Sequence, residues 1–254
     1  MQALPAAALR CGLAAFLVAA AHAAEVSLDV GHTLAARGAT SARGTSEFDF
    51  NRNLAQQLGD ELRARGLAVR EINFDGLVDT LAARPQQAAG SDVFLSLHHD
   101  SVHEDLLQEW DWDGTMRTYS DLHTGFSLFV SRNNPHLADS LRCASAIGAS
   151  MRRAGFDAAL HHATPLAGPA RQPADASNAV FYYDRLVVLY RTTLPAVLFE
   201  AGVIKHREEE LALLDTARQR RMVDAIATGI AACLSVDSAA AIPATARNEE
   251  AQPR

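Results

Sequence analysis

Short apolar runs alternate with longer segments of helical periodicity along most of the chain. Residues 25–30, "EVSLDV", alternate apolar and polar side chains and lead into a glycine, which predicts a half-buried strand. Five further short apolar runs predict strands: residues 67–72, 92–97, 126–130, 185–190 and 196–200. Strands that alternate with helices are typical of an α/β domain with a mainly parallel sheet.

The clearest helix follows the first strand. Apolar residues recur every four positions from Phe50 to Leu62, Ser46 and Asp49 form a capping-box pattern before them, and Gly66 ends the helix. Further helices are predicted over residues 76–90, where a proline must break or kink the helix, 138–155, and 207–236 with one break. We therefore expect a single catalytic domain over residues 24–236. Its fold should be phosphorylase/hydrolase-like, with a mostly parallel twisted sheet flanked by helices on both faces.

Residues 102–124 do not fit this alternation. They are acidic and contain both tryptophans of the chain, Trp110 and Trp112. We interpret them as an insertion over the edge of the sheet, which is either a lid or regulatory segment or a packed surface flap. Residues 237–254 are polar and are expected to be a disordered tail.

The N-terminus resembles an export signal. Residues 11–21 are an apolar run too short to span a bilayer comfortably, and "AHA" at 21–23 fits a cleavage site. A membrane anchor is the alternative, but we favour a signal peptide over residues 1–23, a secreted or periplasmic protein, and no stable membrane insertion after cleavage. Cys143 and Cys233 could pair in that oxidising compartment; we favour two separate buried thiols.

Charge excludes several functions. The chain has 23 Lys and Arg against 30 Asp and Glu, a formal net charge of −7, so it has no electrostatic footprint for nucleic acid. Lys205 is the only lysine, and no Gly-Lys-Ser/Thr sequence is present for a phosphate-binding loop.

The candidate catalytic and metal-binding residues lie where predicted strands end or where the first helix begins. His32, His98 and Glu200 stand at or just past strand ends, and Glu47 opens the first helix. Ligands of α/β sheets bind at this edge, and His and Glu are the usual ligands of catalytic zinc. Each residue alone also has an ordinary explanation, such as a surface histidine or an acid at a helix N-terminus. A helical chelate of His99 with His103 is less favoured, because the pair directly follows a strand.

Four blocks carry a family resemblance. "VSLDVGH", "SEFDFNRNLAQQL", "DVFLSLHHDS" and "LPAVLFEAGVI" resemble, in order, the zinc-dependent type-three N-acetylmuramoyl-L-alanine amidases (Amidase_3), over about residues 25–235. The resemblance implies a Zn²⁺ ion held by His32, Glu47 and His98. It implies Glu200 as the catalytic carboxylate, which takes a proton from water and returns it to the leaving amine.

The resemblance also implies the substrate, the amide bond between N-acetylmuramic acid and L-alanine in peptidoglycan. An activator protein could be a further partner. Asp29, His99, Asp100 and Arg84 are candidates to orient ligands or substrate, and His99 with Asp100 replaces the family's usual Ala-Asn. A zinc peptidase that acts on peptide stems and a non-catalytic cell-wall binding protein are the alternatives.

Overall fold

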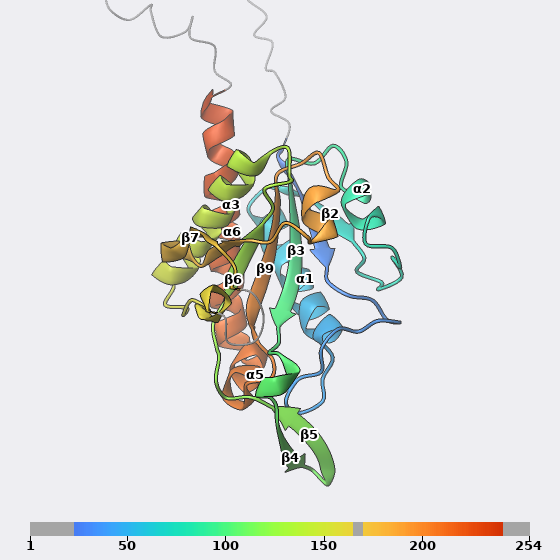
Figure 1. Cartoon of the computed structure of the whole chain (residues 1–254). Helices are drawn as coiled ribbons and strands as arrows, with labels where there is room; N and C mark the ends of the chain where they lie inside the picture. The colour runs from blue at the N-terminus through green and yellow to red at the C-terminus, as the bar shows by residue number, and fades with distance from the viewer. Residues whose placement is uncertain (1–22, 165–169, 241–254) are drawn as a thin grey trace, which may run out of the picture.

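A seven-stranded sheet forms the centre of the computed structural model, which describes residues 23–164 and 170–240 (Figure 1). Its strands, in spatial order, are β2 (Ala68–Ile72), β1 (Glu25–Val30), β3 (Val93–Asp100), β9 (Ala196–Val203), β6 (Ser127–Val130), β8 (Val180–Tyr182) and β7 (Pro173–Asp175). Two pairs, β6 with β9 and β7 with β8, are antiparallel, and the other four are parallel. The expected mostly parallel α/β sheet is confirmed.

Helices cover both faces of this sheet. The long helix α6 (Thr216–Ala240) packs against both α1 (Glu47–Ala64) and α3 (Leu137–Arg153), and α3 and α6 run side by side in Figure 1. The short helices α2 (Ala83–Gln87) and α4 (Val187–Tyr190) contact each other, and α5 (Arg207–Leu214) follows β9. Leu28 of β1 faces Gly59 of α1, whereas the next residue, Asp29, faces Arg84 of α2. Successive residues of a strand point to opposite faces, so α1 and α2 lie on opposite sides.

Helix α1 has the predicted start and buried face. Ser46 is its N-cap, and the Ser46 hydroxyl accepts a hydrogen bond from the Asp49 backbone N–H at 3.4 Å. The apolar stripe from Phe50 to Leu62 is buried in the core. The N-cap thus fixes Glu47 as the first helical residue, at the carboxyl end of the neighbouring strands.

Two predicted elements are wrong. Residues 185–190 contain the short helix α4 instead of a strand, because an apolar run such as Val187–Leu189 can be buried in either conformation. The helix expected over 76–90 is limited to α2, Ala83–Gln87. Pro85 neither breaks nor kinks it, because it lies in the first turn, where a missing N–H has no helical acceptor to lose.

The segment 102–124 contains a β-hairpin. Strands β4 (Gln108–Trp112) and β5 (Thr115–Tyr119) pair antiparallel and project from one end of the molecule (Figure 1). Asp113 and Gly114 turn the hairpin with φ of 54° and 72°, a pattern that "DG" predicts. The short strands β7 and β8 were not predicted either. The part of the chain that the structure describes also contains three 3₁₀ turns: η1 (Glu104–Leu106), η2 (His161–Ala163) and η3 (Ala176–Asn178).

Cys143 of α3 and Cys233 of α6 form a disulfide, so the expectation of two separate thiols is wrong. The two helices pack along their length, which brings residues 90 positions apart into register. Helix α6 continues to Ala240, four residues past the expected end of the domain. The expected signal peptide, apart from its last residue, and residues 241–254 of the expected tail lie outside the described residues. No helix within the described ranges is long and apolar enough to cross a membrane.

Candidate metal centre

His32 follows β1 in an unusual backbone conformation. Its φ is +67°, a left-handed value that non-glycine residues seldom adopt. Two side chains bind its carbonyl oxygen: the Asn73 amide donates to it at 2.6 Å, and the Arg84 guanidinium donates to it from α2. Both donors also bind the carbonyl of Val30, at 2.6 Å and 2.5 Å. The turn that presents the imidazole is therefore held by two buried side chains.

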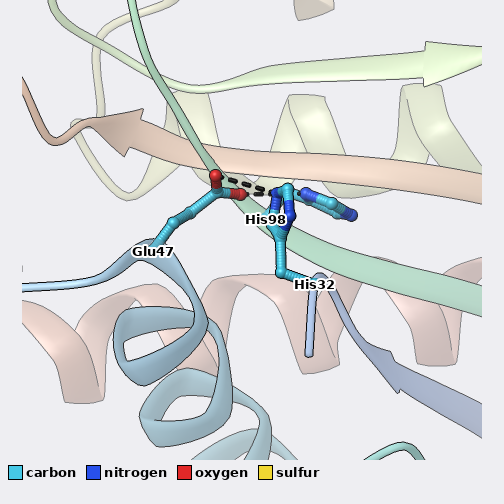
Figure 2. Close-up of side chains that lie close together, drawn as sticks. All are labelled: His32, Glu47 and His98. Carbon is cyan, nitrogen blue, oxygen red and sulfur yellow. Dashed lines mark hydrogen bonds and ion pairs between the residues drawn. The ribbon is translucent and has the colours of Figure 1, made fainter. Parts of the chain in front are cut away.

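Glu47 joins the two predicted histidines. Its Oε2 lies 2.9 Å from Nε2 of His32, and its Oε1 lies 3.0 Å from Nδ1 of His98 (Figure 2). Burial favours a raised pKa for the Glu47 carboxyl, but the hydrogen bonds from both imidazoles outweigh burial and hold that pKa below its ordinary value. One ligand atom from each residue lies within 4.8 Å of the others, so the structure brings all three together.

Two glycines leave room for this group. A Cβ at Gly31 would lie 2.5 Å from the His98 ring, and a Cβ at Gly38 would lie 2.5 Å from Oε2 of Glu47. Gly38 also has a φ of +76°. Any side chain at either position would displace a ligand. Two imidazoles and one carboxylate are a donor set of catalytic zinc sites, in which the fourth position stays open.

Glu200 lies beside His98. The two residues are register partners on the adjacent parallel strands β9 and β3, so their side chains share one face of the sheet. Burial raises the pKa of the Glu200 carboxyl well above its ordinary value, and the negative charges of Asp100 and Glu47 raise it further. Its Oε2 is buried without a hydrogen-bond partner. A carboxyl group with a raised pKa and a free oxygen is suited to take up and return a proton.

The remaining predicted residues divide between two places. The His99 imidazole points to the opposite face, where its Nδ1 lies 2.8 Å from the Asn51 side-chain oxygen, and only the His99 backbone N–H reaches the ligand group, donating to Oε1 of Glu47 at 3.4 Å. His103 is exposed and pairs with Asp105, so the alternative chelate of His99 with His103 is not formed. Asp29 is fully buried; it accepts a hydrogen bond from the Ser96 hydroxyl at 2.6 Å, and its Oδ1 lies 3.5 Å from Nε of Arg84. Asp29 and Arg84 therefore support the turn that presents His32 and are not part of the ligand group itself.

Asp100 belongs to a second group that sequence reasoning missed. His161 and His162, in η2, both approach its carboxylate. The two consecutive histidines are visible in the sequence, but nothing in the sequence places them beside β3. A cavity of about 690 Å³ opens here, lined by Asp100 and both histidines together with Arg132, Arg171 and Tyr183 among others. Trp110 and Trp112 do not line it.

Comparison with known proteins gives one family. The model of the family Amidase_3, described as N-acetylmuramoyl-L-alanine amidase, matches residues 26–232. Among curated proteins, none matches the chain.

Three solved structures illustrate the shared fold. An N-acetylmuramoyl-L-alanine amidase from Clostridium difficile 630 is 18% identical, with a TM-score of 0.65 over 85% of this chain and 98% of that one. Ami1 from Mycobacterium smegmatis is 18% identical, with a TM-score of 0.65 over 84% of this chain and 97% of that one. The catalytic domain of CwlV from Bacillus (Paenibacillus) polymyxa is 23% identical, with a TM-score of 0.63 over 84% of this chain and 99% of that one.

Proposed function

The chain belongs to the Amidase_3 family of N-acetylmuramoyl-L-alanine amidases, and we propose that His32, Glu47 and His98 hold a zinc ion beside the catalytic carboxylate of Glu200. The family acts on peptidoglycan, so the chain is a cell-wall hydrolase. The bond cleaved is the amide between N-acetylmuramic acid and L-alanine.

One observation carries the assignment of residues. Side chains from the end of β1, the start of α1 and the end of β3 converge on one point, although 66 positions separate the first from the last (98 − 32). A buried carboxylate between two imidazoles, with glycines where a side chain would intrude, fits a zinc ion. The fit rests on donor chemistry and on space.

Each residue has a role in hydrolysis. Zinc, when bound, supplies a Lewis acid that polarises the scissile carbonyl and makes water more acidic. Glu200 takes the proton of the attacking water and then gives it to the departing amine of L-alanine. Its unpartnered Oε2 is free to accept that proton, and its position beside His98 places it next to the metal ligands. Asn73 and Arg84 keep the backbone of His32 in place during the reaction.

The place of action and a possible regulator follow from the family. Cell-wall amidases act outside the cytoplasm, and we propose that residues 1–23 direct export, which makes the protein secreted or periplasmic. One structure of similar fold, 20% identical, is the CwlD amidase from Clostridioides difficile in complex with the GerS lipoprotein. By analogy, an activator protein is a candidate partner of this chain.

The decisive experiment compares wild type with Glu200→Gln on purified peptidoglycan sacculi. We expect wild type to release peptide stems that begin with L-alanine, Glu200→Gln to lose at least about a hundredfold in rate, and both to hold the same zinc. The control is Glu208→Gln, an exposed glutamate on α5, which should keep full activity. Cleavage within the stems would indicate a peptidase instead, and zinc binding without cleavage by wild type would indicate a binding protein.

A further inference from the structure

The side chains of Asp100, His161 and His162 meet on the wall of the cavity, outside the ligand group of His32, Glu47 and His98. Nε2 of His161 lies 3.1 Å, and Nε2 of His162 lies 2.9 Å, from the same atom, Oδ2 of Asp100. All three side chains are about seven-eighths buried, with exposures of 13%, 13% and 14%. We propose that these three residues bind a second divalent cation of the zinc class.

The geometry around His162 favours a shared cation over a simple hydrogen-bond network. Its Nε2 is buried and lies 2.9 Å from Oδ2 of Asp100, yet the direction of the N–H does not suit a hydrogen bond, and no other atom of the described residues forms a hydrogen bond with it. Two donor atoms that bind one tetrahedral zinc ion lie about 3.3 Å apart and point at the ion, not at each other. A cation between the three ligand atoms would give this nitrogen the partner that hydrogen bonding does not supply.

Packing holds both imidazoles in place. The His161 ring stacks on His123, with centroids 4.4 Å apart and an interplanar angle of 12°. The His162 ring packs edge-on against Phe129 and Phe181, with centroids 5.0 Å and 5.7 Å away. Ligands whose rotamers are fixed before binding lose little entropy when the cation arrives. Two histidines and one carboxylate are common metal ligands, and here both imidazoles are held in place by packing, as in a metal site.

This group is separate from the first but adjacent to it. Asp100 lies two residues after His98 on β3, so the two side chains share a face of the sheet and stand about 7 Å apart along the strand. Glu200 also lies on that face, paired with His98. The two groups share no ligand. A cation bound by three protein ligands keeps at least one position open, here toward the 690 Å³ cavity, where a carbonyl or carboxylate oxygen of the substrate could occupy it.

Metal content tests the proposal without any activity measurement. The untagged chain is stripped with a chelator, dialysed against a known concentration of Zn²⁺ and analysed for bound zinc by mass spectrometry. We expect two zinc ions per chain for wild type and one for His162→Ala, His161→Ala and His32→Ala. We expect none for the double variant His32→Ala/His162→Ala. His136→Ala is the control, because His136 is exposed at the start of α3, and it should keep two.

Each outcome decides the question. One zinc ion in wild type, unchanged in His162→Ala and lost in His32→Ala, would overturn the second site and leave the first intact. No zinc in wild type would overturn both. Circular dichroism melting of every variant checks folding, and Asp100→Asn, which keeps the side-chain shape, replaces any histidine variant that fails to fold. If Asp100→Asn kept both zinc ions, the second site would also be excluded.

Discussion

The guanidinium of Arg84, on helix α2, donates a hydrogen bond to the backbone carbonyl of His32. Arg84 is 2% exposed and is among the largest fully buried side chains of the protein. It also lies next to the buried carboxylate of Asp29. One side chain therefore neutralises a buried charge and holds the left-handed turn that presents a candidate ligand.

Replacement of Arg84 by alanine should affect both stability and metal binding. Removal of one partner of a buried ion pair costs about 3–5 kcal/mol of unfolding free energy, since Asp29 is left uncompensated. The His32 turn loses a donor as well, so zinc affinity should fall by about tenfold to a hundredfold. Chemical denaturation and zinc titration measure the two effects.

The matched control is Arg63→Ala, an exposed arginine that pairs with Glu71. We expect its unfolding free energy to change by no more than about 1 kcal/mol and its zinc affinity to stay the same. If Arg84→Ala lost stability but bound zinc as wild type does, Arg84 would support the fold without positioning His32.

Most of the candidate centre was predictable because its signals are local. His32 and His98 are marked by strand ends, and Glu47 by the helix start at Ser46. Each signal depends on a few neighbouring residues, and the parallel sheet then places strand ends at one edge. Long-range packing gives no such signal. The approach of His161 and His162 to Asp100 depends on a loop whose path is set by tertiary contacts.

The wrong elements have the same physical origin. The run from Val187 to Leu189 is equally apolar as a strand or as a turn of helix, and only its neighbours decide between them. The Cys143–Cys233 disulfide requires that α3 and α6 pack side by side with the two cysteines opposite each other. No residue near either cysteine signals this alignment. Sequence alone therefore predicts the sheet and its ligands better than the contacts between distant elements.

His99 should make the fold sensitive to mild acid. Burial lowers the pKa of its imidazole from 6.5 to about 3, although the charge of Glu47 opposes this shift. As the pH falls below 6.5, His99 takes up a proton in the unfolded chain but stays neutral in the folded chain. The contribution of neutral His99 to the free energy of unfolding is therefore full above pH 6.5 and is lost as the pH falls toward 3. Stability should decrease by up to about 1.4 kcal/mol for each pH unit below 6.5.

The variant His99→Gln tests this directly. Between pH 6.5 and 5.5 its unfolding free energy should fall by roughly 1 kcal/mol less than that of wild type, because glutamine does not titrate. Denaturant titrations at a series of pH values give the slopes. His136→Gln, at an exposed position, should show the wild-type slope. Equal slopes for wild type and His99→Gln would mean that His99 is protonated in the folded protein.

The disulfide between Cys143 and Cys233 should contribute substantially to stability. It closes a segment of 90 residues and so restricts the unfolded chain; disulfides of this kind contribute about 2–4 kcal/mol. A reducing agent should lower the melting temperature of wild type to that of the double variant Cys143→Ser/Cys233→Ser. The same agent should leave the double variant unchanged, and a shift there would show that the reductant acts elsewhere, for example on a bound metal.

Trp110 should couple the β4–β5 hairpin to the metal centre. Its indole N–H donates to the carbonyl of Ala42 at 3.0 Å, and its ring stacks on Trp112 and lies near Arg43. Ala42 lies in the loop that leads to Ser46 and Glu47. Trp110→Ala should therefore cost about 1–2 kcal/mol of stability and weaken zinc binding by loosening that loop.

Two comparisons separate this packing role from that of a lid. Met116→Ala changes an exposed hairpin residue, so it should leave zinc affinity and turnover unchanged. Deletion of residues 104–122 should weaken zinc binding as Trp110→Ala does, since both remove the contact with Ala42. A lid over the substrate would instead lower turnover of sacculi in the deletion variant while zinc affinity stayed at the wild-type value, and that pattern would contradict the coupling proposed for Trp110.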